Sequence, residues 1–140
     1  MKNLLTPLGM VVDRTSEDVA KRTKKGVYNA DDMNRVSAAV ELLRPVFRDF
    51  GYSVGDAEIR EWAENELPRL SEAEEFLAAV RALDGRFRYA EEMIALPETM
   101  RMLTHADANN IEKFLSAMPE VFERMQTAWY YADEIICGEV

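Results

Sequence analysis

The feature that most constrains this chain is the spacing of its apolar residues. They recur alternately three and four residues apart at Met33, Val36, Val40, Leu43, Phe47 and Phe50. An α-helix has about 3.6 residues per turn, so this spacing places the whole set on one helix face. The pattern returns twice more, at Ala73, Phe76, Val80, Leu83, Phe87, Ala90 and Ile94, and then at Ile111, Leu115, Met118, Phe122, Met125, Trp129 and Ala132. The sequence therefore predicts an all-α fold.

Capping residues predict where the helices begin and end. Thr15 and Asn29 each precede acidic residues, which suit the positive N-terminus of a helix, and Thr104 precedes the last apolar stripe. Gly26 and Gly51 follow the first two predicted helices, where glycine commonly ends a helix. We expect helices to start after each of these caps.

Two further helices are predicted between residues 56 and 94. Asp56 is placed to cap a short third helix that stops before Pro68. Ser71 and Glu74 have the spacing of a capping box for a fourth helix. Gly85 interrupts the apolar stripe of this fourth helix without shifting its phase, so we expect one helix with a weak point.

These elements predict a single helical domain over residues 1–140. Its length of 140 residues and 48% hydrophobic content suit one packed core. We expect residues 1–13 to form an extended arm, 15–134 a bundle of about five helices, and 135–140 a short tail. Pro45 and Pro119 fall inside predicted helices and would either kink or split them.

Composition excludes several classes of function. The balance of 17 basic against 26 acidic residues gives a net charge of -9, which disfavours binding to phosphates of nucleic acid. The acidity suits a solvated surface, a basic partner or mimicry of a nucleic acid. Cys137 is the only cysteine, so no disulfide can form within the chain. We see no signal peptide and no apolar run of about 20 residues, and expect a soluble protein.

No motif in the chain points to catalysis. His105 is the only histidine, and a nucleophilic pair with Cys137 would require the two to meet in space. Asp31 and Asp32 lack the alternating ligands and glycine of a calcium loop. Gly-rich phosphate loops, nucleophile elbows and histidine pairs at metal-ligand spacing are absent from the sequence. We therefore predict no enzyme activity, no cofactor and no metal.

The last apolar stripe allows two interpretations. Short connectors favour burial against neighbouring helices of the same domain, while a heptad-like stripe can also form a coiled-coil contact between subunits. The aromatic run that closes this stripe, Trp129-Tyr130-Tyr131, places rings on several faces of one turn. Such a run is typical either of a protein–protein contact or of a core corner with hydroxyls reaching water.

A series of short motifs runs through the chain in a defined order. They are Asp13-Arg14-Thr15 and Asp18-Val19; Gly26, Tyr28-Asn29-Ala30-Asp31 and Asn34-Arg35-Val36; Gly51-Tyr52, Trp62 and Pro68; Leu103-Thr104, Ala108-Asn109 and Ile111-Glu112; and Trp129-Tyr130-Tyr131, Glu134-Ile135 and Gly138-Glu139. In their order and spacing the chain resembles a family of small, mostly uncharacterised proteins and protein segments encoded in the tail and tail-fibre region of phages and prophages of Gram-positive bacteria. The resemblance covers nearly the whole chain. In that family the segment between the Asp-Val and Gly-x-Tyr-Asn motifs is often longer, and Gly and Tyr often stand where this chain has Asp133 and Ile136.

The resemblance implies a virion structural protein of the tail, baseplate or fibre assembly, with no known catalytic activity. Its partners would be other tail proteins within a symmetric assembly or homo-oligomer, with no nucleic acid or membrane, and it would assemble in the host cytoplasm. The alternative is a small acidic phage-encoded inhibitor that binds a host protein or mimics nucleic acid. The resemblance gives a structural role to Arg14, Tyr28, Asn29, Asp32, Asn34 and Arg35. Asn34 and Arg35 are expected to bond the N-terminal arm or the C-terminal tail. The candidates for contact with a partner are Trp129, Tyr130, Tyr131, Glu134 and Ile135.

Overall fold

A computed structural model describes residues 4–55, 59–63, 69–84 and 94–138, with backbone alone for 84 and 129–138. Its elements are a 3-10 turn, η1 (Thr6–Leu8), and four α-helices, α1 (Ser16–Ala20), α2 (Ala30–Asp49), α3 (Leu70–Asp84) and α4 (His105–Gly138). No β-strand occurs in the described ranges. The all-α prediction is therefore confirmed at this level.

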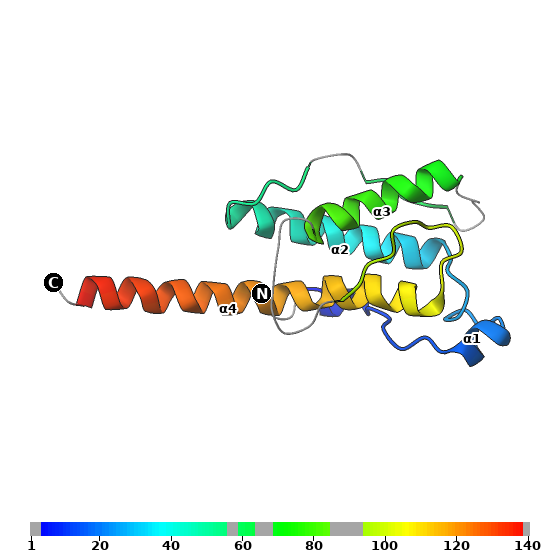
Figure 1. Cartoon of the computed structure of the whole chain (residues 1–140), viewed down its shortest axis with the longest axis horizontal. Helices are drawn as coiled ribbons and strands as arrows, with labels where there is room; N and C mark the ends of the chain where they lie inside the picture. Colours follow the sequence, from blue (N-terminus) through cyan, green and yellow to red (C-terminus); the bar gives the residue numbers. More distant parts are fainter. Residues whose placement is uncertain (1–3, 56–58, 64–68, 85–93, 139–140) are drawn as a thin grey trace.

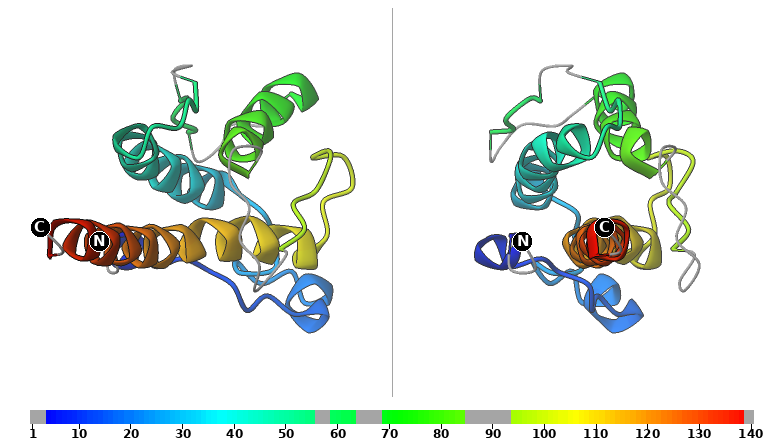
Figure 2. Two further views of the ribbon diagram at one scale, coloured as in Figure 1. Left: turned by 60° about the vertical axis from the view of Figure 1, so that its left-hand side comes forward. Right: turned by 90° about the vertical axis from the view of Figure 1, so that its left-hand side faces the viewer.

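The helices form a short body from which one helix extends (Figure 1). Helices α2 and α3 lie along the first half of α4, and the short α1 lies near the beginning of α4. The second half of α4 continues alone beyond the end of α2, and the two rotated views show the same arrangement (Figure 2). Helix α4 thus belongs to the core of the body as far as Phe122 and Met125, and the part of the helix after them extends beyond the body.

The predicted apolar stripes form that core. From α2 it takes Val36, Leu43 and Phe47, each 0% exposed, and α3 contributes Val80 and Leu83. From α4 it takes Ile111, Phe114, Leu115, Met118 and Phe122, all 0% exposed. The rings of Phe47 and Phe122 meet edge to face, with 4.6 Å between their centroids. As far as Phe122, the α4 stripe is therefore buried within its own chain and is not a seam between subunits.

Three of the predicted caps are present with reciprocal bonds. Thr15 and Asp18 form a capping box at α1, and Asn29 and Asp32 form one at α2. At α4, the Asp107 backbone N–H donates to Thr104 Oγ1 over 3.1 Å, and the Thr104 N–H donates to Asp107 Oδ2 over 3.2 Å. Each box satisfies N–H groups that the first turn of a helix leaves without a partner.

The third predicted helix is wrong in the described part of its range. Residues 59–63 carry no helix, and the rest of the 56–68 segment lies outside the described residues. The reason is a tertiary contact. The Trp62 N–H donates to Asn34 Oδ1 over 2.7 Å, and the Trp62 carbonyl accepts from Asn34 Nδ2 over 2.8 Å. These are the backbone groups that a helix would have used.

The limits of three other elements differ from the predictions. Helix α3 begins at Leu70, so Ser71 lies inside it, and Glu74 accepts bonds from Thr99 Oγ1 and the Met100 N–H instead of closing a capping box. The continuation of this helix past Gly85 lies outside the described residues, while residue 94 is not helical. At the front, residues 6–8 form a turn where a wholly extended arm was expected. Helix α4 runs to Gly138, so 135–138 are helical and not a separate tail.

Glycine and proline positions refine the description of α1, α2 and α4. Helix α1 ends at Ala20, and Gly26 instead lies against its backbone, where an added Cβ would be 2.2 Å from the Asp18 carbonyl oxygen. Gly51 ends α2 with a φ of 89°, as predicted for a left-handed cap. Pro45 and Pro119 both lie within continuous helices, so neither proline splits its helix.

Candidate functional site

The most unusual feature of the body is a buried guanidinium at Arg14. This residue precedes α1 and is 4% exposed. Its Nη2 lies 2.6 Å from Glu112 Oε2 on α4 and 3.1 Å from Asp32 Oδ1 in the first turn of α2. Arg14 thereby joins three segments of the chain through charge-assisted hydrogen bonds, which are among the strongest available to a protein.

Arg35 completes the group from the next turn of α2. Its Nε lies 2.5 Å from Glu112 Oε1, and its Nη2 donates to Asp32 Oδ1 over 2.5 Å and to Glu112 Oε2 over 3.0 Å. Burial would lower the pKa of Arg35, but the hydrogen bonds to Glu112 and Asp32 outweigh this effect and hold it above its ordinary value. The two cations and two anions balance, as burial of charge requires. We call Arg14, Asp32, Arg35 and Glu112 the buried ion network.

The chain leading to α1 is held against α4 by the same region. The Arg14 N–H donates to Asn109 Oδ1 over 3.0 Å, and the Arg14 carbonyl accepts from Asn109 Nδ2 over 2.9 Å. The Val11 N–H donates to Glu112 Oε1 over 3.0 Å. The Arg14 side chain also donates to the carbonyl of Lys25 over 3.1 Å. A non-helical segment thus has its backbone groups satisfied by side chains, as a buried loop requires.

Tyr28 closes one side of the network. The Arg14 guanidinium carbon lies 5.6 Å from the centroid of the Tyr28 ring, within the range of a cation–π interaction. The Tyr28 hydroxyl is buried and has no hydrogen-bond partner among the described residues. Burial, followed by the charges of Glu112 and Asp32, raises the pKa of Tyr28 well above its ordinary value of 10.0. The phenol therefore stays neutral in the folded protein.

The structure places the predicted motif residues in two groups. Arg14, Tyr28, Asp32 and Arg35 meet at the buried ion network. Beside it Asn29 caps α2, because its Oδ1 accepts from the Asp32 backbone N–H over 3.2 Å, and the Asn29 N–H donates in return to Asp32 Oδ2 over 2.9 Å. Asn34 does not join them. It holds the backbone of Trp62, so the expectation that Asn34 would bond the arm or the C-terminal tail is wrong. Among the described residues Arg35 makes no direct bond to the arm. It donates to the Glu112 carboxylate, which also accepts from the Val11 N–H and from Arg14.

Glu112 and Asn109 are the site residues that sequence reasoning did not select. Both occur in the family-like motifs, but no site role was assigned to them. Glu112 is 0% exposed and lies beside Ile111 on the buried face of α4. A carboxylate on an otherwise apolar helix face is a signal that the sequence does carry, because it must find a cation when it is buried.

The predicted contact residues lie on the extending part of α4. The backbone of Trp129, Tyr130, Tyr131, Glu134 and Ile135 is helical, while their side chains lie outside the described part of the chain. The last described side chains before them, Gln126, Thr127 and Ala128, are all exposed. The helix has therefore left the body before Trp129.

His105 and Cys137 lie far apart on the same helix. His105 begins α4 and Cys137 lies near its end, and at about 1.5 Å per residue the helix separates them by roughly 48 Å. The two residues do not form a pair within one chain.

Among the residues that the structure describes, no group of three or more His, Cys, Asp or Glu is arranged to hold a metal ion. The described helices include none long and apolar enough to cross a membrane.

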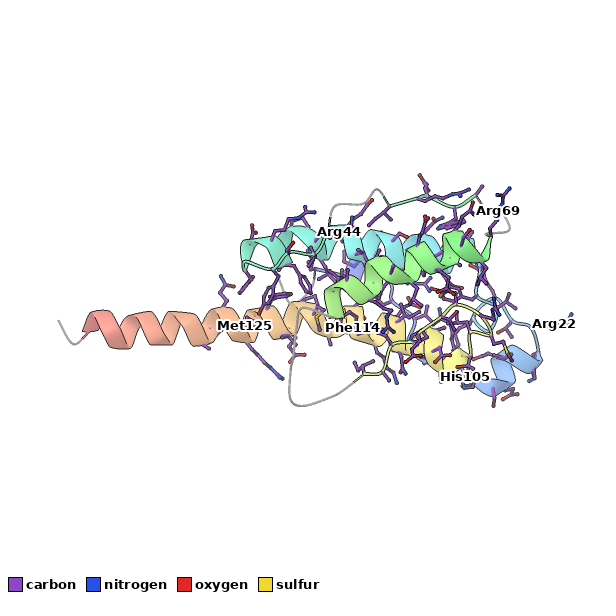
Figure 3. The ribbon with its side chains drawn as sticks, turned by 45° about the horizontal axis from the view of Figure 1, so that its top comes forward. Arg22, Arg44, Arg69, His105, Phe114 and Met125 are labelled. Atoms are coloured by element: carbon purple, nitrogen blue, oxygen red, sulfur yellow. The ribbon has the colours of Figure 1, made fainter. Side chains whose placement is uncertain are left out.

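The side chains of the body and the labelled positions along α4 are shown in Figure 3, where His105, Phe114 and Met125 mark successive parts of the helix. Met125 lies where α4 leaves the body, and Phe114 lies between α4 and the helices above it.

No protein-family model, curated protein or solved structure matches the chain.

Proposed function

We propose that this chain is a structural protein of a phage or prophage tail, baseplate or fibre assembly that acts through protein–protein contact. The proposal rests on the motif resemblance and on one structural observation, the extension of α4 beyond the body (Figure 1). A contact protein needs a surface offered to a partner, and the extending half of α4 is such a surface.

A helix that extends alone calls for a partner on physical grounds. Most of the stability of a helix in a protein comes from tertiary packing of its apolar face rather than from helix propensity. The part of α4 beyond Gln126 extends past the body, and its sequence is rich in large apolar residues, Trp129, Tyr130, Tyr131, Ile135 and Ile136. Aromatic residues are enriched where proteins meet. Contact with another protein would stabilise this segment.

The buried ion network gives the extension a fixed base. Glu112 lies in the first half of α4 and is bound to Arg14 and Arg35 from two other segments. Buried ionic groups of this kind set the register of packed elements more than they add stability. A helix whose base cannot rotate or slide presents its far end in one direction, which lowers the entropic cost of docking.

A site-specific photo-cross-linker tests this proposal in the producing cell. Placed at Thr127, the last exposed threonine before the undescribed side chains, it should trap a tail, baseplate or fibre protein during particle assembly. The control position is Arg101, which is exposed on the body. Cross-links to a host protein in place of a virion protein would overturn the structural role and favour the acidic inhibitor. An equal yield from both positions would refute the role of α4.

A further inference from the structure

A cavity of about 380 Å³ lies between α2, α3 and the segment that joins them. Its walls are mainly apolar and include Val40, Val54, Ile59, Trp62, Phe76 and Val80. Cavities that bind small molecules have volumes of about 300–1,000 Å³ and are lined mostly by apolar and aromatic side chains. The cavity is thus of the size and chemistry that suits a small molecule.

One hydroxyl group on the wall of the cavity is buried without a hydrogen-bond partner among the described residues. Ser37 on α2 lines the cavity and is 6% exposed, and its Oγ has no hydrogen-bond partner within the described residues. A buried hydroxyl without a partner is costly, and native proteins rarely retain one. Charged side chains also line the cavity, at Arg44, Arg60, Glu72 and Glu75, but most of the wall is apolar, so few waters there would find the two to four polar partners that each requires.

The cavity is also lined by charged groups that pair with one another. Arg60 lies over the Trp62 ring, 4.5 Å from its centroid, and its Nη1 is 3.0 Å from Glu72 Oε1 on α3. The contact with Arg60 holds the Trp62 ring, and Asn34 holds the Trp62 backbone. The aromatic wall is therefore held in place before any ligand arrives.

We propose that this cavity binds a small, mainly apolar molecule that carries one hydrogen-bonding group. The apolar part would lie against Val40, Val54 and Val80, and the polar group would bond to Ser37 Oγ. A hydroxyl group can donate or accept, so alcohols, phenols and carbonyl compounds all satisfy it. The inference does not depend on a role in a phage tail.

The test uses p-cresol and toluene, which differ by one hydroxyl, as probes of the full-length 15N-labelled protein by NMR titration. Both should give saturable shifts at the amides of Ser37, Val40 and Val54. Ser37→Ala should weaken p-cresol binding by about five- to tenfold, while leaving toluene binding unchanged or tighter. Shifts that do not saturate, or that lie away from these amides, would overturn the proposal.

A matched pair of variants tests the location. Ala79 on α3 lines the cavity and is half-buried, so Ala79→Phe should fill the space and abolish binding of both probes. Ala106→Phe makes the same change at an exposed position on α4 and should leave binding unchanged. If Ala79→Phe retains a dispersed spectrum and still binds either probe with wild-type affinity, the cavity is not the site. If Ser37→Ala weakens both probes equally, the assigned hydrogen bond is wrong.

Discussion

Arg14 and Glu112, 98 residues apart in the sequence, form a buried ion pair with 2.6 Å between Nη2 and Oε2. Their side chains are 1% and 0% exposed. Because Glu112 also binds Arg35 and the Val11 backbone, one carboxylate connects the chain before α1, helix α2 and helix α4. It is the point at which the base of the extending helix is fixed to the body.

Replacing Glu112 is expected to destabilise the protein strongly. Glu112→Gln removes the charge that both arginines share and leaves uncompensated positive charge in the core, a change that typically costs about 3–5 kcal/mol. The free energy of unfolding from urea titration measures this loss. Glu120→Gln is the matched control, because Glu120 pairs with Arg124 on the surface of α4, and it should cost less than about 1 kcal/mol. Equal losses would contradict the role of the network.

Removing the Tyr28 hydroxyl is expected to leave stability unchanged or to raise it by about 1 kcal/mol, because the buried group has no partner among the described residues. Tyr28→Phe keeps the ring beside Arg14. A loss above about 1 kcal/mol in urea unfolding would show that the hydroxyl makes a stabilising bond.

Tyr28 also predicts how stability changes in alkali. Its pKa is raised on folding, so its contribution to stability is complete below the ordinary value of 10.0 and is lost progressively above it. Thermal melts from pH 9 upward should therefore show a decline in wild type that is shallower in Tyr28→Phe. Identical slopes for the two proteins would contradict the buried environment of this phenol.

Glu74 predicts the response to acid. The bonds from Thr99 Oγ1 and from the Met100 N–H lower its pKa below the ordinary value of 4.5. A lowered pKa gives stability that is present above about pH 4.5 and falls as the pH drops below it. Because the group is exposed, the effect should be small. Glu74→Gln and Thr99→Ala should each flatten the fall in melting temperature below pH 4.5, and a slope unchanged in both would refute the contact.

Gly26→Ala is expected to destabilise the chain by about 2 kcal/mol, because its Cβ would meet the Asp18 backbone and one of two segments must move. Gly55→Ala is the control. Gly55 has a φ of +76° but no atom within 4 Å of an added Cβ, so it should cost only about 1 kcal/mol of backbone strain. Chemical denaturation measures the free energy of unfolding of both variants. A larger loss for Gly55→Ala than for Gly26→Ala would contradict the packing of Gly26 against α1.

Local sequence signals predicted the parts of this fold that local physics determines. The cap at Asn29 is a bond within one helix turn, so it can be read from neighbouring residues. The pairing of Arg14 with Glu112 depends on how α4 returns beside α2, which no local pattern contains. The prediction of the third helix was wrong for the same reason, because the Asn34 side chain on α2 forms hydrogen bonds with the backbone N–H and carbonyl of Trp62.

The proposed role in a phage tail is tested most directly by quantitative mass spectrometry of purified particles from an induced lysogen. The account predicts that the protein is present at a simple fixed ratio to a tail component, and that Glu112→Gln lowers this ratio while Glu120→Gln does not. Absence of the wild-type protein from the particles, when it is abundant in the lysate, would contradict the account.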